Sequence, residues 1–323
     1  MEVLHTSLLT SHFCLQTSVV PVVLAAGITS AAVTGQRVPV FRGGVDLVNV
    51  AVTVTDRKSN LVSDLTVDDF EIFEDGKKQT PRYFSAGLNT GSGDPPMHLG
   101  LLLDVSESMG EDIAFTKTAA VRFLNTLTEA VDITFVDFDT EIRATRYSQA
   151  DFARVIERIR LQKASGWTAL YDAIGVYLDG ARSLDGRKLM LLYTDGGDTR
   201  SAMRWSDLLT LLKATDVTVY AIGEMEHQSA SARVHARSVL QAIAETTGGA
   251  AFFPSTVKEL DEIYDKILAE MRAQYTIAYH STNAAADGAW RKVEVTIARA
   301  PGRDLRVRTR KGYFASYKPA AKP

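Results

Sequence analysis

An apolar run followed at once by a loop of acidic and hydroxyl residues constrains the fold of this chain more than any other feature. Leu99–Leu103 shows no alternation of apolar and polar residues, which is typical of a central strand covered on both faces. The loop Asp104–Met109 follows directly. In an open parallel sheet, ligands bind outside the carboxyl ends of such strands. We therefore expect this loop to carry binding residues.

Three side chains of this loop are spaced two residues apart, so a tight turn can point them at one place. They are Asp104, Ser106 and Ser108, and all three supply oxygen atoms. Hard oxygen ligands without Cys or His suit Mg²⁺, Mn²⁺ or Ca²⁺ and do not suit zinc. Asp and Ser ahead of a helix are also ordinary capping residues, so Ser108 could instead cap the helix that follows.

Two further stretches favour the metal site. The sequence GWTALYDAI places Thr168 at the start of a second predicted helix, and LMLLYTDGGDT places Asp195 at the end of a second apolar strand. A DxSxS motif after one strand, a threonine at a helix start and an aspartate after another strand resemble the metal-ion-dependent adhesion site of the von Willebrand factor type A (VWA) domain. Every position of that pattern is occupied here.

The resemblance implies a role for each of these residues. Ser106 and Ser108 would bind a divalent cation directly, and Thr168 would bind it directly or through water. Asp104 and Asp195 would act largely through waters. The cation would be Mg²⁺ in the first place, with Mn²⁺ or Ca²⁺ as alternatives. One coordination position would remain for an Asp or Glu carboxylate of a protein ligand.

Three residues beside these positions are candidates for the rim of the ligand-binding face. Trp167 precedes Thr168 and is expected either to contact a partner or to pack in the core. Asp198 and Thr199 follow Asp195, and they either line the metal face or complete a turn at Gly196-Gly197. We favour the turn for these two.

Composition and motifs exclude several classes of function. The 323 residues are 46% hydrophobic and 23% charged, which is typical of a globular protein, and a net charge of −3 gives no electrostatic case for nucleic acid. There is no G-x-S-x-G elbow and no G-x-x-x-x-G-K-[ST] nucleotide loop. An aspartyl-phosphate phosphatase would need an acid where Ser106 stands. We expect no enzyme, and a hydrolase is the weaker alternative.

The amino-terminal segment resembles a secretory signal peptide over residues 1–35. Residues 3–36 contain no Lys, Arg, Asp or Glu, and the apolar core Val19–Ala26 is shorter than a membrane span and precedes small residues. A positive n-region is missing, which a wrongly chosen start codon or a chain that is not exported would explain. Cys14 is the only cysteine, so a mature chain would have no disulfide. We expect a secreted, periplasmic or cell-surface protein without a transmembrane span.

Strands and helices alternate over residues 97–273, which predicts a doubly wound, mostly parallel α/β sheet. The strands Ile133–Asp139 and Glu141–Arg146 are too close in sequence for a crossover, so they should form an antiparallel hairpin at the sheet edge. This order of elements also resembles the VWA domain. The predicted helices are 112–130, 151–161, 169–181, 205–213, 234–246 and 258–271.

The flanking segments 36–88 and 274–316 are rich in strands. Val45–Asp56 alternates with period two, and Phe70–Phe73 and Gln79–Phe84 flank a hairpin signal at Asp75-Gly76. Neither segment has enough strands for a stable sheet alone, so both should pair into one β-sandwich that receives the VWA-like region as an insertion. Residues 89–96 are expected to be a linker and 317–323 a disordered tail.

The stretch LTVDDFEIFEDGKKQ, residues 65–79, also resembles the leader of a secreted bacterial VWA-related subfamily. Arg306, Arg308 and Arg310 alternate with Leu305, Val307 and Thr309, which predicts a solvated outer strand face, with a polyanion site as the alternative. His227 and His235 are expected to be surface residues and not a zinc pair.

The sequence therefore favours a binding or adhesion protein that acts outside the cytoplasm through a bound cation. The alternative is an intracellular VWA subunit that assists an ATPase in metal insertion or in remodelling a complex.

Overall fold

The computed structural model describes residues 47–87, 95–127, 129–225, 227–298 and 304–317. The predicted signal peptide 1–35 and most of the predicted linker 89–96 lie outside these residues. All the described residues belong to one compact unit. In the part of the chain that is described, no helix is both long enough and apolar enough to cross a membrane.

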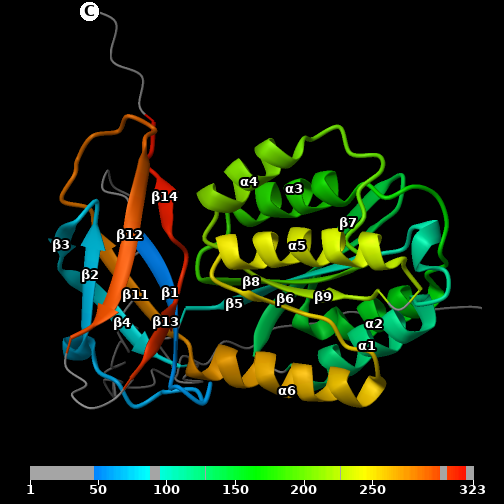
Figure 1. Cartoon of the computed structure of the whole chain (residues 1–323), viewed down its shortest axis with the longest axis horizontal. Coiled ribbons are helices and arrows are strands. Elements are labelled where there is room, and N and C mark those ends of the chain that lie inside the picture. The colour runs from blue at the N-terminus through cyan, green and yellow to red at the C-terminus, as the bar shows by residue number, and fades with distance from the viewer. Residues whose placement is uncertain (1–46, 88–94, 128, 226, 299–303, 318–323) are drawn as a thin grey trace, which may run out of the picture. The chain divides into compact units, whose positions relative to one another are not determined.

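A six-stranded sheet of order β10-β9-β8-β5-β6-β7 forms the centre of the fold (Figure 1). Five of its strands run parallel, and β7 pairs antiparallel with β6 at the edge, as the short connection predicted. The strands are β5 (Met97–Asp104), β6 (Ala130–Phe138), β7 (Ile142–Ser148), β8 (Arg187–Thr194), β9 (Thr218–Gly223) and β10 (Ala250–Phe252).

Helices cover both faces of this sheet, as Figure 1 shows. One face carries α1 (Ile113–Thr126), α2 (Phe152–Leu161) and α6 (Val257–Ala273). The other face carries α3 (Leu170–Ala181), α4 (Trp205–Ala214) and α5 (Ala230–Thr246). The doubly wound α/β class predicted from the alternation of elements is confirmed.

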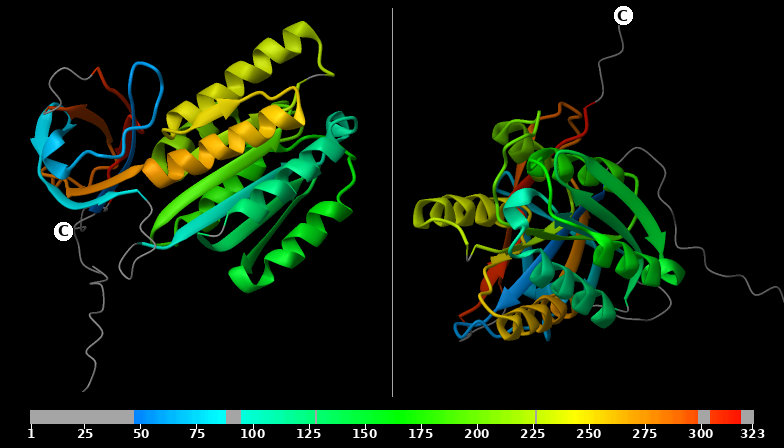
Figure 2. Two further views of the ribbon diagram at one scale, coloured as in Figure 1. Left: turned by 90° about the horizontal axis from the view of Figure 1, so that it is seen from below. Right: turned by 90° about the vertical axis from the view of Figure 1, so that its right-hand side faces the viewer.

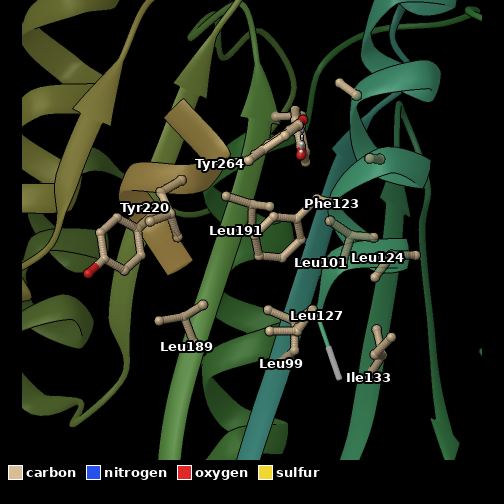
Figure 3. Packing of buried hydrophobic residues seen from close by; sticks show 14 of the residues in the cluster. Leu99, Leu101, Phe123, Leu124, Leu127, Ile133, Leu189, Leu191, Tyr220 and Tyr264 are labelled. Atoms are coloured by element: carbon tan, nitrogen blue, oxygen red, sulfur yellow. Dashed lines mark hydrogen bonds between the residues drawn. The ribbon is translucent and has the colours of Figure 1, made fainter. Parts of the chain in front are cut away.

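Strand β5 lies at the centre of both cores, and every one of its residues is buried. Leu99 and Leu101 pack against Phe123 and Tyr264 on the first face, where Figure 3 shows them together. Leu102 faces the second core. Burial on both faces is the physical reason why the run lacks alternation.

Two further four-stranded sheets pack against each other, and each draws strands from both ends of the described chain. The first has the order β13-β1-β11-β4 and the second β14-β12-β2-β3. Val50, Ile72, Ile277 and Val295 belong to one buried cluster that fills the space between them, so the two sheets form the expected sandwich. The strands are β1 (Leu47–Thr55), β2 (Phe70–Glu74), β3 (Lys77–Gln79), β4 (Pro81–Ala86), β11 (Tyr275–His280), β12 (Trp290–Ile297), β13 (Arg306–Arg308) and β14 (Gly312–Phe314).

The chain leaves and re-enters the sandwich at neighbouring points. Ala86 at the end of β4 pairs with Tyr275 at the start of β11, and the Gly87 N–H donates to the Gln274 carbonyl at 3.2 Å. Gly87 has φ +77°, and a Cβ there would lie 2.4 Å from the Arg272 carbonyl oxygen, so this junction needs glycine. Figure 2 shows α6 leading straight into β11. Adjacent connections of this kind allow one fold to be inserted in another.

Some predicted boundaries differ from the structure. Helix α1 ends at Thr126, because Ala130 already pairs with Met97 in the sheet. The hairpin turn at Asp75-Gly76 is present, with φ +48° and +78°, but the strand expected over residues 79–84 is divided between β3 and β4 of different sheets. Pro81 stands at the division, where a residue without N–H cannot continue the ladder.

The expectation of a solvated arginine face is wrong for two of its three residues. Arg306 is exposed, but Arg308 pairs with Glu270 of α6 and donates to the Gly248 carbonyl at 3.1 Å. Arg310 is buried and donates to the Thr215 carbonyl at 3.2 Å. Period-two alternation predicts which side chains share a face, but it does not show that the helix ends of the inserted unit cover that face. Nearer the carboxyl end of the described chain, Tyr317 forms an isolated bridge with Asp287, and residues 318–323 are not described.

Candidate metal centre

The loop after β5 folds back on its own aspartate. The Ser106 N–H donates to Asp104 Oδ1 at 3.0 Å, and the hydroxyl oxygens of Ser106 and Ser108 lie 3.1 Å apart. Asp104 and Ser106 are fully buried, whereas Ser108 is exposed. Neither the short 3₁₀ turn Glu107–Met109 nor α1 begins with a side-chain cap. The alternative in which Ser108 caps the helix is therefore not supported.

Thr168 is buried two residues ahead of α3 and is fixed by the loop that follows β8. Its N–H donates to Thr199 Oγ1 at 3.0 Å, and its carbonyl accepts hydrogen bonds from the N–H groups of Thr199 and Arg200, both at 2.9 Å. Asp198 accepts from the Tyr171 N–H at 3.2 Å and from the Ser201 hydroxyl at 2.6 Å. Asp198 and Thr199 thus hold the segment that carries Thr168.

The same segment also contacts the loop after β5. The Ser165 N–H donates to the Val105 carbonyl at 2.8 Å, and the Glu107 N–H donates to the Gly166 carbonyl at 3.0 Å. These bonds bring Thr168 to the edge of the sheet where Ser106 and Ser108 lie. Parallel strands end at a common edge, which is why residues so far apart in sequence share this place.

The end of β8 supplies a second aspartate and a residue that the sequence analysis missed. Asp195 is buried, and its Oδ1 accepts from the Gly197 N–H at 3.0 Å. Thr194 donates its hydroxyl proton to Asp104 Oδ2 at 2.6 Å and accepts from the Gly196 N–H at 3.1 Å. The position of Thr194, immediately before Asp195 at a strand end, is the only sequence signal that marks it.

Electrostatics at this edge favour a positive ion. Burial, and after it the nearby Asp195 carboxylate, raise the pKa of Asp104 to about 7 even though hydrogen bonds from Ser106 and Thr194 lower it. A cation beside the two carboxylates would offset their repulsion.

The donor set fits a hard divalent cation. Oxygen atoms on adjacent positions of an octahedral Mg²⁺ lie about 3.0 Å apart when each bond is about 2.1 Å, which matches the spacing of the two serine hydroxyls. Nowhere in the described ranges do three or more His, Cys, Asp or Glu side chains form a group that could hold a metal. A cation at this edge would therefore depend on Ser and Thr oxygens.

Trp167 and the two histidines named above lie at the surface. Trp167 is 65% exposed, so the core-packing alternative is excluded. His227 lies 3.0 Å from both Glu111 and Asp112, and it is exposed, as is His235. The two histidines are surface residues, as predicted.

The chain is similar to proteins of a known family. Residues 98–266 match the model of the von Willebrand factor type A domain. Among solved structures, the match to a von Willebrand factor type A protein from Catenulispora acidiphila has 16% identity and a TM-score of 0.45, and it spans 78% of this chain and 74% of that protein. The match to the vWF domain of the type V pilus tip protein Mfa5 from Porphyromonas gingivalis has 14% identity and a TM-score of 0.44, and it spans 56% of this chain and 97% of that domain. The match to BatB from Bacteroides thetaiotaomicron has 14% identity and a TM-score of 0.43, and it spans 54% of this chain and 98% of that chain. No curated protein matches the chain.

Proposed function

The chain belongs to the von Willebrand factor type A domain family, and from this premise we propose that it binds an acidic group of a protein ligand through a divalent cation. The observation that carries the proposal is the pair of serine hydroxyls 3.1 Å apart beside the buried carboxylates of Asp104 and Asp195. Mg²⁺ is the cation we propose first, with Mn²⁺ or Ca²⁺ as alternatives.

Ser106, Ser108 and Thr168 would hold the cation through neutral hydroxyl oxygens, and Asp104 and Asp195 would act largely through waters. Neutral oxygen ligands leave a divalent ion much of its positive charge, so an incoming Asp or Glu carboxylate is attracted to it. Ser108 is exposed, which leaves the ligand a route to the site from solvent. Such an interaction needs no bond to be made or broken, and we propose that the protein is not an enzyme.

The surrounding residues keep the donors in place before the ligand arrives. Thr194 fixes Asp104, and Thr199 fixes the backbone of Thr168. Donors that are held in advance lose little conformational freedom on binding, which is the usual reason for such supporting hydrogen bonds.

We also propose that the protein acts outside the cytoplasm, because residues 1–35 resemble a signal peptide. Cell fractionation followed by amino-terminal sequencing tests this. A chain in the exported fraction that starts between residues 31 and 37 supports the proposal. A cytosolic chain with residues 1–35 intact contradicts it and favours the ATPase-assisting subunit.

Binding is tested with a displayed library of nonapeptides that share a central Asp and are random elsewhere. The full chain is expected to retain peptides in Mg²⁺ and release them in EDTA. A Ser106→Ala/Ser108→Ala variant should retain none, while circular dichroism shows that its fold is intact. Equal retention in Mg²⁺ and EDTA would contradict the proposal.

A further inference from the structure

Trp167 presents a large aromatic surface directly beside the proposed cation site. It is 65% exposed, and the next residue is Thr168, which is buried. Exposed tryptophans are enriched among the residues that dominate binding energy at interfaces. The proposed cation site accounts for capture of a carboxylate, but it does not use this ring.

The backbone that carries the indole is fixed on both sides. The Trp167 N–H donates to Thr140 Oγ1 at 2.9 Å, and the Gly166 carbonyl accepts from the Glu107 N–H at 3.0 Å. Gly166 has φ +76°, and a Cβ there would lie 2.6 Å from Thr140 Oγ1, so only glycine fits this turn. A side chain on such a backbone is presented to solvent at little further cost in conformational entropy.

Each of the two loops that hold Trp167 carries an exposed glutamate. Glu107 stands between the two serines of the metal site and makes no ion pair within the described residues. Glu141 follows Thr140, and its side chain is 80% exposed and 3.6 Å from Arg143. Glu107 therefore has no ion-pair partner among the described residues, and Glu141 has one long ion pair, with Arg143.

The arginines near Glu141 are already engaged. Arg143 pairs with Asp137 and Asp139, and Arg158 pairs with Asp137 at 2.5 Å. Near the β6–β7 turn, the two aspartates and Glu141 therefore share only two guanidinium groups. One negative charge of this group is not balanced. A purely acidic ligand would be repelled by this surround even while the cation attracted its carboxylate.

We infer that Trp167, flanked by Glu107 and Glu141, receives an arginine or lysine side chain of the ligand, so that the recognised segment carries a basic residue close to its acidic one. The inference rests on the proposed cation-dependent binding and defines its partner. The face of an indole ring attracts cations, and the carboxylates of the two loops that hold Trp167 would add Coulomb attraction for the same basic side chain. The pairing also selects against ligands that carry only negative charge.

The displayed nonapeptide library tests this with the full chain in Mg²⁺. Among peptides released by EDTA, Arg or Lys should be enriched about three- to tenfold at positions within three residues of the fixed Asp, as expected for a cation on an exposed ring with carboxylates nearby. In Trp167→Ala this enrichment should fall close to onefold, and Trp167→Phe should keep part of it. A Glu107→Gln/Glu141→Gln variant should lower it by about half or more.

Tyr83→Ala is the matched control, because Tyr83 is an exposed aromatic residue on β4 of the sandwich. It should leave the enrichment unchanged. Selection of aromatic or proline residues in place of basic ones would overturn the inference and leave cation-dependent binding standing, as would basic enrichment that persists in Trp167→Ala. Absence of any pool released by EDTA would overturn the proposed function and the inference with it.

Discussion

The hydroxyl of Thr194, at the end of β8, donates a 2.6 Å hydrogen bond to Oδ2 of Asp104, at the end of the neighbouring strand β5. The other oxygen of Asp104 accepts from the Ser106 N–H. The carboxylate at the centre of the proposed site is therefore held by one group from its own loop and one from the adjacent strand.

Replacing Thr194 by Val should separate this supporting role from packing. The variant keeps the shape of the side chain but leaves Asp104 Oδ2 and the Gly196 N–H without their partner, so it should be less stable by about 1–3 kcal/mol. Its affinity for Mg²⁺ should fall about tenfold or more. Thr194→Ser, which retains the hydroxyl, should restore most of both quantities, measured by denaturant unfolding and by calorimetric titration.

Gly100 should be intolerant of a side chain, because the ring of Tyr177 occupies the space. A Cβ at Gly100 would lie 2.2 Å from that ring, because Tyr177 on α3 packs against the central strand β5. Gly100→Ala should lower the free energy of unfolding by about 1–3 kcal/mol.

Gly180, near the end of the same helix, is the control for Gly100. A Cβ there meets nothing within 4 Å, so Gly180→Ala should raise the free energy of unfolding by roughly 0.5–1 kcal/mol. Equal changes in the free energy of unfolding for the two substitutions would contradict the close contact between Tyr177 and β5.

Glu224 should make stability depend on pH. Burial, and after it the Asp112 carboxylate, raise its pKa to about 8, and its Oε1 has no hydrogen-bond partner in the described part of the chain. When the pKa of an acid is higher in the folded state than in the unfolded state, the protein is most stable with that acid protonated. The contribution of Glu224 to the free energy of unfolding is therefore complete below pH 4.5 and is lost as the pH rises towards 8.

Glu224→Gln removes this titration. The variant should exceed the wild type in free energy of unfolding by about 1–3 kcal/mol at pH 9, and the difference should shrink towards zero at pH 4.5. Glu245→Gln, at an exposed position of α5, should show no such trend. A difference that is the same at both pH values would contradict the buried, protonated state of Glu224.

Local patterns were sufficient to predict the central part of the fold. Leu99–Leu103 is buried on both faces, so its lack of alternation indicated a central strand, and the loops at strand ends indicated where the candidate site would lie. The hairpin of β6 and β7 followed from the shortness of the connection between them. These are properties of a residue and its near neighbours in sequence, and a single sequence contains them.

Features that depend on contacts between distant segments could not be predicted. Thr194 carries no motif, and its role appears only when β8 lies beside β5. Arg310, between β13 and β14, is buried and donates to the Thr215 carbonyl just past α4, a contact that alternation alone does not show. One strand was expected over residues 79–84, yet the chain passes at Pro81 from one sheet of the sandwich to the other.

Calorimetric titration of Mg²⁺ and Mn²⁺ into the full chain tests the central claim most directly, with Ser106→Ala/Ser108→Ala as the variant. A Ser183→Ala/Ser238→Ala control removes two exposed hydroxyls elsewhere. We predict one bound ion per chain in the wild type and the control, and none in the Ser106→Ala/Ser108→Ala variant, with unchanged circular dichroism. Undiminished affinity in that variant, or absence of binding by the wild type, would contradict a metal site built on these serines.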